Sequence, residues 1–294
     1  MKENQSLSRI RPMSPISLVL GLILLASGRV LGAAPLPPGQ PLRMALVSDV
    51  HLCGGSNAPV HRARFQRTIA AVNAVGVDFV MITGDLTDEG RADQTAEFRR
   101  LIRQFHAPVF YVPGNHDLGG KIVPGKKSDK KRDVNSFRVA RYEMEMGPSF
   151  FVRVQSGVRV VGINGSLLNS GLGREKKMWS LLEKEMFKPN TNLTVALVHY
   201  PPFLKTVDEP GGEYWNVEPY PRARLLALLK QGGVRAVLSG HLHRPVVNRR
   251  DGVLFITTHP VAFGLPEKTQ PEGWTLLTVP ARGEIQYEPQ NIMH

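Results

Sequence analysis

Short apolar runs that predict buried β-strands alternate with helical segments along most of this chain. The strand-like runs are 44–47, 78–83, 108–112, 194–198 and 234–238. The helical segments are 60–75, 92–105, 175–187 and 222–230, a hairpin pattern occupies 150–163, and further short strands are expected near 246, 254–258 and 276–279. Strands that alternate with helices imply an α/β fold with a parallel sheet.

The composition is that of an ordinary globular protein. The chain has 294 residues, of which 42% are hydrophobic and 21% charged, so it is neither a disordered chain nor a collagen-like repeat. Cys53 is the one cysteine, which excludes an intramolecular disulfide. We expect residues 43–290 to form a single domain.

The first residues predict a targeting signal. Basic residues precede the apolar run 16–26, small residues follow it, and prolines then prevent a continuing helix. We therefore expect a signal peptide at 1–33, a Pro-rich linker at 34–42, and export to the periplasm or the extracellular space. An uncleaved membrane anchor fits less well, because the run is about half of the roughly 20 residues that a bilayer requires, so no stable membrane span is expected.

Polar side chains follow five of the predicted strands, at the point where each strand ends. In open α/β sheets, ligands bind outside the carboxyl ends of the strands. The residues at these positions are Asp49, His51, Asp85, Asn115, His116, Asp117, His199, His241 and His243. Carboxylate, imidazole and amide groups hold divalent metals without thiolate. Each motif alone is common by chance, but five at one edge of one sheet favour a metal site.

The ordered motifs D-x-H, G-D, G-N-H-D, H and G-H-x-H closely resemble the calcineurin-like metallophosphoesterase family, over roughly residues 44–260. The resemblance implies a four-layer αββα sandwich, with two mixed β-sheets flanked by helices. It also implies two divalent metal ions. The ligand types do not distinguish between manganese, iron and zinc. The implied ligands are Asp49, His51 and His243 for the first ion, Asn115, His199 and His241 for the second, and Asp85 as the bridge between them.

The resemblance further implies a mechanism in which metal-activated water attacks phosphorus. His116 is similar to the family's histidine that stabilises charge on the phosphoryl group and protonates the leaving oxygen. Asp88 has the spacing of the acid that orients this histidine in protein phosphatases. The alternative for Asp88 is the N-cap of the helix that follows.

Departures from the family pattern narrow the expected substrate. Purple acid phosphatases have a metal-binding tyrosine at the position of Asp88, and protein phosphatases have a phosphate-gripping arginine at the position of Glu89. The chain most resembles single-domain class III cyclic-nucleotide phosphodiesterases. We therefore expect a small phosphoester substrate, with phosphodiesters favoured over monoesters.

The charge leaves two alternatives open. The formal net charge is +12, and six lysines or arginines lie in the stretch 121–132, directly after the G-N-H-D motif. This stretch could attract an anionic ligand, or it could be a solvated loop. A nucleic-acid substrate is less favoured, since no aromatic residues interleave the lysines. A non-catalytic binding scaffold on the same fold is the other alternative, and it predicts the loss of ligands, none of which is missing.

Overall fold

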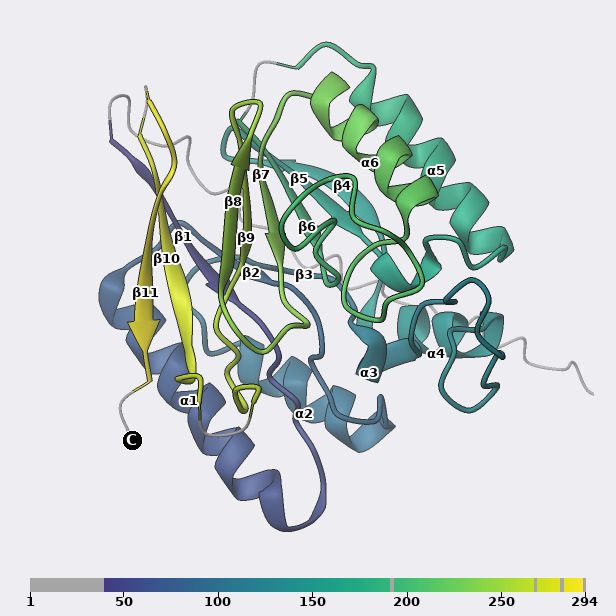
Figure 1. Ribbon diagram of the computed structural model, residues 1–294. Helices are drawn as coiled ribbons and strands as arrows, with labels where there is room; N and C mark the ends of the chain where they lie inside the picture. The colour runs from purple at the N-terminus through teal and green to yellow at the C-terminus, as the bar shows by residue number, and fades with distance from the viewer. Residues whose placement is uncertain (1–39, 191–192, 267–268, 281–282, 293–294) are drawn as a thin grey trace, which may run out of the picture. The chain divides into compact units, whose positions relative to one another are not determined.

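The computed structural model describes residues 40–292, except 191–192, 267–268 and 281–282 (Figure 1). The expected signal peptide and most of the expected linker lie outside the described residues. The strands of the first sheet are β1 (Leu42–Val47), β2 (Phe79–Ile82), β3 (Val109–Tyr111), β10 (Gly273–Val279) and β11 (Gln286–Asn291). Within the described ranges they form a five-stranded sheet of order β11-β10-β1-β2-β3. The strands β1, β2 and β3 are parallel, whereas β10 is antiparallel to both of its neighbours.

The second sheet contains the strands of the middle and later parts of the chain. They are β4 (Phe151–Gln155), β5 (Val158–Ile163), β6 (Leu193–Val198), β7 (Val234–Ser239), β8 (Val246–Arg250) and β9 (Val253–Thr257). In the described part of the chain, their order is β4-β5-β6-β7-β9-β8. The four central strands are parallel, and β4 and β8 are antiparallel edge strands.

The two sheets face each other across an apolar layer. Alternate residues of a strand point to opposite faces. Met44 and Leu46 therefore lie in the cluster that contains Leu197 from the opposite sheet, whereas Ala45 and Val47 belong to the cluster on the other face of β1. Because both faces of the sheet are covered, its central strands are apolar throughout.

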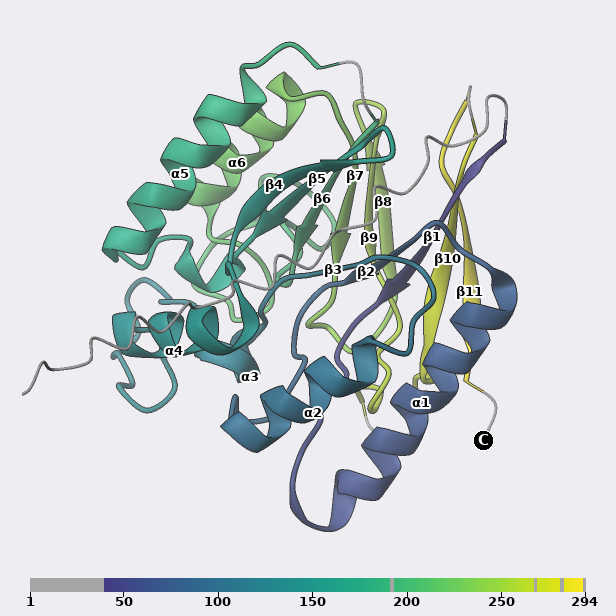
Figure 2. The ribbon, with the colours of Figure 1, turned by 180° about the vertical axis from the view of Figure 1, so that it is seen from behind.

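Helices cover the outer faces of the two sheets. The helices are α1 (Ala58–Val75), α2 (Ala92–Ile102), α3 (Asn115–Leu118), α4 (Ser136–Met146), α5 (Gly173–Met186) and α6 (Pro219–Gln231). Figures 1 and 2 show α1 and α2 on the side of the first sheet, and α5 and α6 together on the side of the second. This arrangement confirms the expected αββα sandwich. No helix in the described ranges is both long and apolar enough to cross a bilayer.

The alternation of strands and helices alone predicts one parallel sheet, but the structure has two mixed sheets, as the family resemblance implies. Strands joined by short turns pair antiparallel, because a parallel partner requires a crossover connection. The β4–β5 and β8–β9 pairs have such turns. The polar motifs follow β1, β2 and β3 in one sheet, and β6 and β7 in the other.

Candidate metal centre

The loops that follow β1, β2, β3, β6 and β7 meet where the two sheets converge. Backbone hydrogen bonds join neighbouring loops: the Asp49 amide donates to the Gly84 carbonyl at 3.1 Å, and the Gly240 amide donates to the His199 carbonyl at 3.0 Å. The loops of the two sheets also meet, since the His241 amide donates to the Asp49 carboxylate at 3.1 Å. Residues almost 200 positions apart in the sequence are thereby brought into contact.

A first group of buried side chains comes from the loops after β1, β2 and β7. One ligand atom each from Asp49, His51, Asp85 and His243 lies within 4.8 Å of the others. The Nε2 atoms of His51 and His243 are 3.2 Å apart. His51 Nε2 is 3.5 Å from Asp85 Oδ2, and His243 Nε2 is 3.5 Å from Asp49 Oδ1.

A second group shares Asp85 with the first. One ligand atom each from Asp85, His199 and His241 also lies within 4.8 Å of the others. His199 Nε2 is 3.3 Å from Asp85 Oδ2 and 3.0 Å from the amide oxygen of Asn115. All seven residues expected to hold metal are therefore assembled at one place, with one carboxylate between two clusters of histidines.

The histidines are oriented so that one nitrogen faces the centre. His199 and His243 can each donate their Nδ1 hydrogen to a backbone carbonyl, at 2.8 Å from Thr83 and 2.7 Å from Phe263. His51 Nδ1 is 3.1 Å from the Asp88 carboxylate. Oxygen partners of this kind fix the tautomer of metal-binding histidines and leave Nε2 as the electron-pair donor.

One buried nitrogen of the centre has no hydrogen-bond partner among the described residues, and this tests the fit of a metal. That nitrogen is Nε2 of His241. A buried polar atom without a partner destabilises a fold. The facing Nε2 atoms of His51 and His243 gain nothing from their approach unless a proton or a cation lies between them. Nitrogen and oxygen donors in this arrangement fit a divalent cation.

The backbone at these residues is strained. In the described part of the chain, eight residues other than glycine have a positive φ. Five of the eight are candidate metal ligands, with φ of 53° at Asp49, 45° at His51, 47° at Asp85, 71° at His241 and 51° at His243. Such conformations are unfavourable for residues with a Cβ and concentrate at functional sites.

Glycines allow the loops to approach one another. Gly84 has a φ of 101°, and a Cβ there would lie 2.7 Å from His199 Nδ1. At Gly114 an added Cβ would collide with the carboxylate of Asp85. The glycine at 114 is therefore required by the close approach of the backbone to Asp85, and not by an unusual φ.

The charges of the centre depend strongly on burial. Burial lowers the pKa of His241 well below its usual value. Burial also opposes the charged form of His199, but the neighbouring Asp85 carboxylate outweighs it and raises the pKa of His199 to about 9. Opposite effects on two histidines that share one carboxylate indicate an uneven electrostatic field in the centre.

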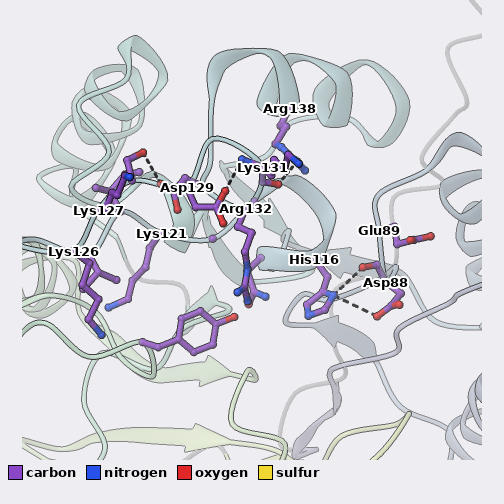
Figure 3. Close-up of a pocket in the computed structure, with 18 residues that line it drawn as sticks. Asp88, Glu89, His116, Lys121, Lys126, Lys127, Asp129, Lys131, Arg132 and Arg138 are labelled. Atoms are coloured by element: carbon purple, nitrogen blue, oxygen red, sulfur yellow. Dashed lines mark hydrogen bonds and ion pairs between the residues drawn. The ribbon is translucent and has the colours of Figure 1, made fainter.

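His116 lies at the rim of the centre and is held by Asp88 (Figure 3). Its Nδ1 is 2.8 Å from the Asp88 carbonyl and 3.3 Å from the Asp88 carboxylate. Burial disfavours the charged imidazole, but Asp88 and Asp85 raise the pKa of His116 to about 10. The N-cap of α2 is Arg91, so the structure does not support Asp88 in that role.

Asp117 is a positioning residue to which the sequence analysis assigned no role, although it closes the G-N-H-D motif. Its buried carboxylate accepts hydrogen bonds from the amides of Leu86 at 3.1 Å, Thr87 at 2.9 Å and Gly114 at 2.8 Å. It thereby joins the loop after β2 to the loop after β3. Burial and the charge of Asp85 raise the pKa of Asp117 to about 6.

Two aromatic rings pack against the histidines that follow β7 in the second sheet. The ring of Tyr214 lies 4.7 Å from that of His241, and the ring of Phe263 lies 4.4 Å from that of His243. Both aromatics come from loops with weak strand or helix patterns. Tyr214 lies in the loop between β6 and α6 that also carries His199, whereas Phe263 had no sequence signal that would link it to a histidine.

Comparisons with known proteins agree on one family. The sequence profile of the calcineurin-like phosphoesterases matches residues 42–245. The chain is 25% identical over 242 residues to a probable glycerophosphodiester phosphodiesterase, GpdQ, of Arcobacter nitrofigilis, which covers 77% of this chain and 82% of that protein. It is 27% identical over 205 residues to the serine/threonine-protein phosphatase CPPED1 of Danio rerio, covering 65% of this chain and 62% of that relative, so less than two thirds of its length.

A solved structure has the same fold. A dimetal phosphatase from Danio rerio matches with a TM-score of 0.56 and 10% sequence identity, over 87% of this chain and 98% of that one. At this identity the likeness concerns the fold alone.

Proposed function

This chain belongs to the calcineurin-like phosphoesterase family and is a metal-dependent phosphoester hydrolase, and we propose that it hydrolyses phosphodiesters with two divalent metal ions. The observation that carries the proposal is the position of Asp85. Its Oδ2 atom is 3.5 Å from His51 Nε2 in one cluster and 3.3 Å from His199 Nε2 in the other. A carboxylate shared in this way could serve as a ligand to both ions of a two-metal site.

The proposal assigns each donor to an ion. Asp49, His51 and His243 would hold the first ion, Asn115, His199 and His241 the second, and Asp85 both. Two ions at such a site supply a water nucleophile that is active near neutral pH and positive charge for the phosphoryl oxygens.

The protein's own contribution to proton transfer comes from His116. Asp88 holds Nδ1 of this ring through its carbonyl and its carboxylate, which leaves Nε2 available. From the rim of the centre, His116 can give a proton to the leaving oxygen of the ester. Asp88 acts as the positioning residue for His116.

Glu89 supports the preference for diesters. It lines the same cavity as His116, and its carboxylate is half exposed, with Arg91 Nη1 at 3.4 Å. A phosphomonoester carries up to two negative charges near neutral pH, whereas a diester carries one. The carboxylate at this position therefore repels a monoester more strongly.

The test compares two chromogenic esters. The chain from residue 34 onward is stripped of metal and resupplied with manganese, iron or zinc, and then assayed with bis(4-nitrophenyl) phosphate and 4-nitrophenyl phosphate. We expect turnover that depends on the metal, with a higher kcat/KM for the diester. Preferred turnover of the monoester would overturn the diester preference, and no turnover with any metal would favour a non-catalytic scaffold.

A variant of Asp85 tests the two-metal assignment. Loss of a residue that only orients a metal ligand lowers activity by about 10- to 100-fold, so Asp85→Asn is expected to lower kcat/KM by more than about 100-fold. Metal analysis should show fewer ions bound per chain than in the unaltered protein. Asp251→Asn, in an exposed turn, is the matched control. Full activity of Asp85→Asn would contradict the assignment.

We also propose that residues 1–33 direct export and are removed. The support is the order of basic, apolar and small residues in this segment. The mass of the mature protein from cell fractions checks this: a chain that begins near residue 34 and lies outside the cytoplasm is expected.

A further inference from the structure

A cavity of about 530 Å³ opens beside the candidate metal centre. Asn115 and His116 line it, and both belong to the centre described above. Tyr214 also lines it, and the ring of Tyr214 lies 4.7 Å from that of His241. The cavity is therefore continuous with the place where the ester would react, and is large enough for more of a substrate than a single phosphoryl group.

One part of the cavity wall is strongly basic. The cationic side chains of Lys126, Lys127, Lys131 and Arg132 line it. In the ranges that the structure describes, these four side chains have no hydrogen bond or ion pair. Like charges gathered without partners repel one another, and an anion bound among them would remove this repulsion.

The acidic residues of the same wall are already engaged. The Asp133 carboxylate accepts hydrogen bonds from the Ser128 hydroxyl and the Asp129 amide, both at 2.7 Å. The Asp129 carboxylate accepts the Lys131 amide at 2.9 Å. Figure 3 shows Asp88 and Glu89 on one side of His116, and Arg132, Lys126 and Lys127 on the other.

Residues 121–132 form a basic segment whose two ends are joined by backbone hydrogen bonds, which hold the backbone of Arg132 in place. The Gly120 amide donates to the Arg132 carbonyl, and the Val134 amide donates to the Gly120 carbonyl, both at 2.8 Å. Lys121 is expected from the sequence to be part of the solvated basic stretch, but it is buried and differs from the other cations. Its Nζ donates to the Glu218 carboxylate and to the Glu213 carbonyl, both at 2.6 Å.

We propose that this cavity binds a second phosphate group of the substrate, beside the phosphodiester that is hydrolysed. The inference rests on the proposed function and names its substrate class: phosphodiesters with a further phosphate on one of the two esterified groups. The planar guanidinium of Arg132 can hold a phosphate through two hydrogen bonds, and the lysines add point charges. Arg132 is the specificity-determining residue.

A matched pair of substrates tests the inference. They are thymidine 5′-(4-nitrophenyl phosphate) and the same compound with a 3′-phosphate, which differ only in the second phosphate. We expect kcat/KM to be at least about tenfold higher for the compound with the 3′-phosphate, as for a group held by charged hydrogen bonds. Equal values for the two compounds would overturn the inference and leave the proposed function intact.

Variants locate the effect. Arg132→Gln should bring the ratio of the two kcat/KM values close to one. Lys130→Gln is the control, because it removes the same charge from the same segment at a residue that does not line the cavity. An equal loss in both variants would indicate general attraction to a basic loop and contradict a defined site.

Binding provides a readout that does not depend on catalysis. Calorimetric titration of the metal-stripped chain with inorganic pyrophosphate should give a Kd that Arg132→Gln raises by at least about fivefold and Lys130→Gln leaves nearly unchanged. Pyrophosphate binding that depends on Arg132 would support the anion site. If no metal form of the same protein hydrolysed bis(4-nitrophenyl) phosphate, the proposed function would be overturned while the anion site remained. Binding that is indifferent to Arg132 would overturn the anion site.

Discussion

At the scale of single residues, the backbone of the candidate metal ligands is strained, and hydrogen bonds around the centre hold it in the strained conformation. Five candidate ligands adopt positive φ values, and each conformation of this kind costs about 1–3 kcal/mol. The surrounding hydrogen bonds maintain them: the Asp117 carboxylate alone binds the amides of Leu86, Thr87 and Gly114. A backbone held by such hydrogen bonds would lose less entropy when an ion binds.

Gly114→Ala tests how closely the loops must approach. The new Cβ would collide with the Asp85 carboxylate, so we expect kcat/KM to fall by at least about tenfold, as when a group that orients a metal ligand is lost. Steady-state kinetics with bis(4-nitrophenyl) phosphate measure this. Gly173→Ala is a control for the loss of a glycine, since an added Cβ there meets open space and the residue, like Gly114, has no positive φ. Activity equal to that of the unaltered protein in Gly114→Ala would refute the argument.

The polar residues of the centre could be predicted from the sequence, but the aromatic side chains that pack against its histidines could not. Asp49, Asp85 and His241 stand in short motifs directly after apolar runs, and this pattern is local. Tyr214 lies farther along the loop that begins with His199, and Phe263 lies in the loop after β9. Their ring contacts with histidines depend on tertiary packing. No local periodicity encodes such a contact.

At the scale of elements, one buried ion pair connects two loops that border the cavity. Lys121 begins the basic segment, Glu218 precedes α6, and both side chains are almost fully buried at 2.6 Å from each other. Burial lowers the pKa of Lys121 even though Glu218 favours its charged form. Such a pair contributes little net stability, but its disruption leaves an uncompensated charge.

Removal of one charge of the Lys121–Glu218 pair should therefore lower the free energy of unfolding more than removal of both charges. We expect Glu218→Gln to lower the free energy of unfolding by about 3–5 kcal/mol, and Lys121→Met combined with Glu218→Gln to recover part of this loss. Denaturant unfolding at pH 7 measures both. Glu183→Gln, from the half-exposed pair with Arg224, serves as the control and should change stability by about 1 kcal/mol or less. A double variant less stable than Glu218→Gln would contradict the explanation.

The elements missed by sequence analysis have weak or mixed patterns. Helix α4 buries Val139, Tyr142 and Met146, but it also exposes Phe137 and Met144, which obscures the apolar stripe. Strand β11 is mostly exposed and contains a proline, as edge strands can. The central strands were predictable because burial on both faces makes them continuous apolar runs.

At the scale of the whole described domain, the candidate centre spans both sheets. Asp49, His51 and Asp85 follow strands of the first sheet, whereas His199 and His243 follow strands of the second. The sequence motifs predict the set of residues but not its division between two sheets, because strand pairing depends on connections along the whole chain. An ion bound there would hold the two sheets together.

Metal removal should consequently lower thermal stability. An ion present at about 1,000 times its Kd stabilises a protein by about 4 kcal/mol, which corresponds to a rise in Tm of roughly 8 °C or more for a domain of this size. Melting of the chelator-treated chain, with and without manganese or zinc, measures the difference. Asp85→Asn should reduce the metal-induced rise, Asp251→Asn should not, and a Tm indifferent to every metal would argue against the centre.

The division of the centre also has a consequence for protein synthesis. Asp49 and His51 leave the ribosome 192 residues before their contact partners, His241 and His243. Under the proposed assignment, neither cluster is complete while those two histidines are still inside the ribosome. Metal acquisition is therefore a late event for each new chain, timed by the order of residues along it.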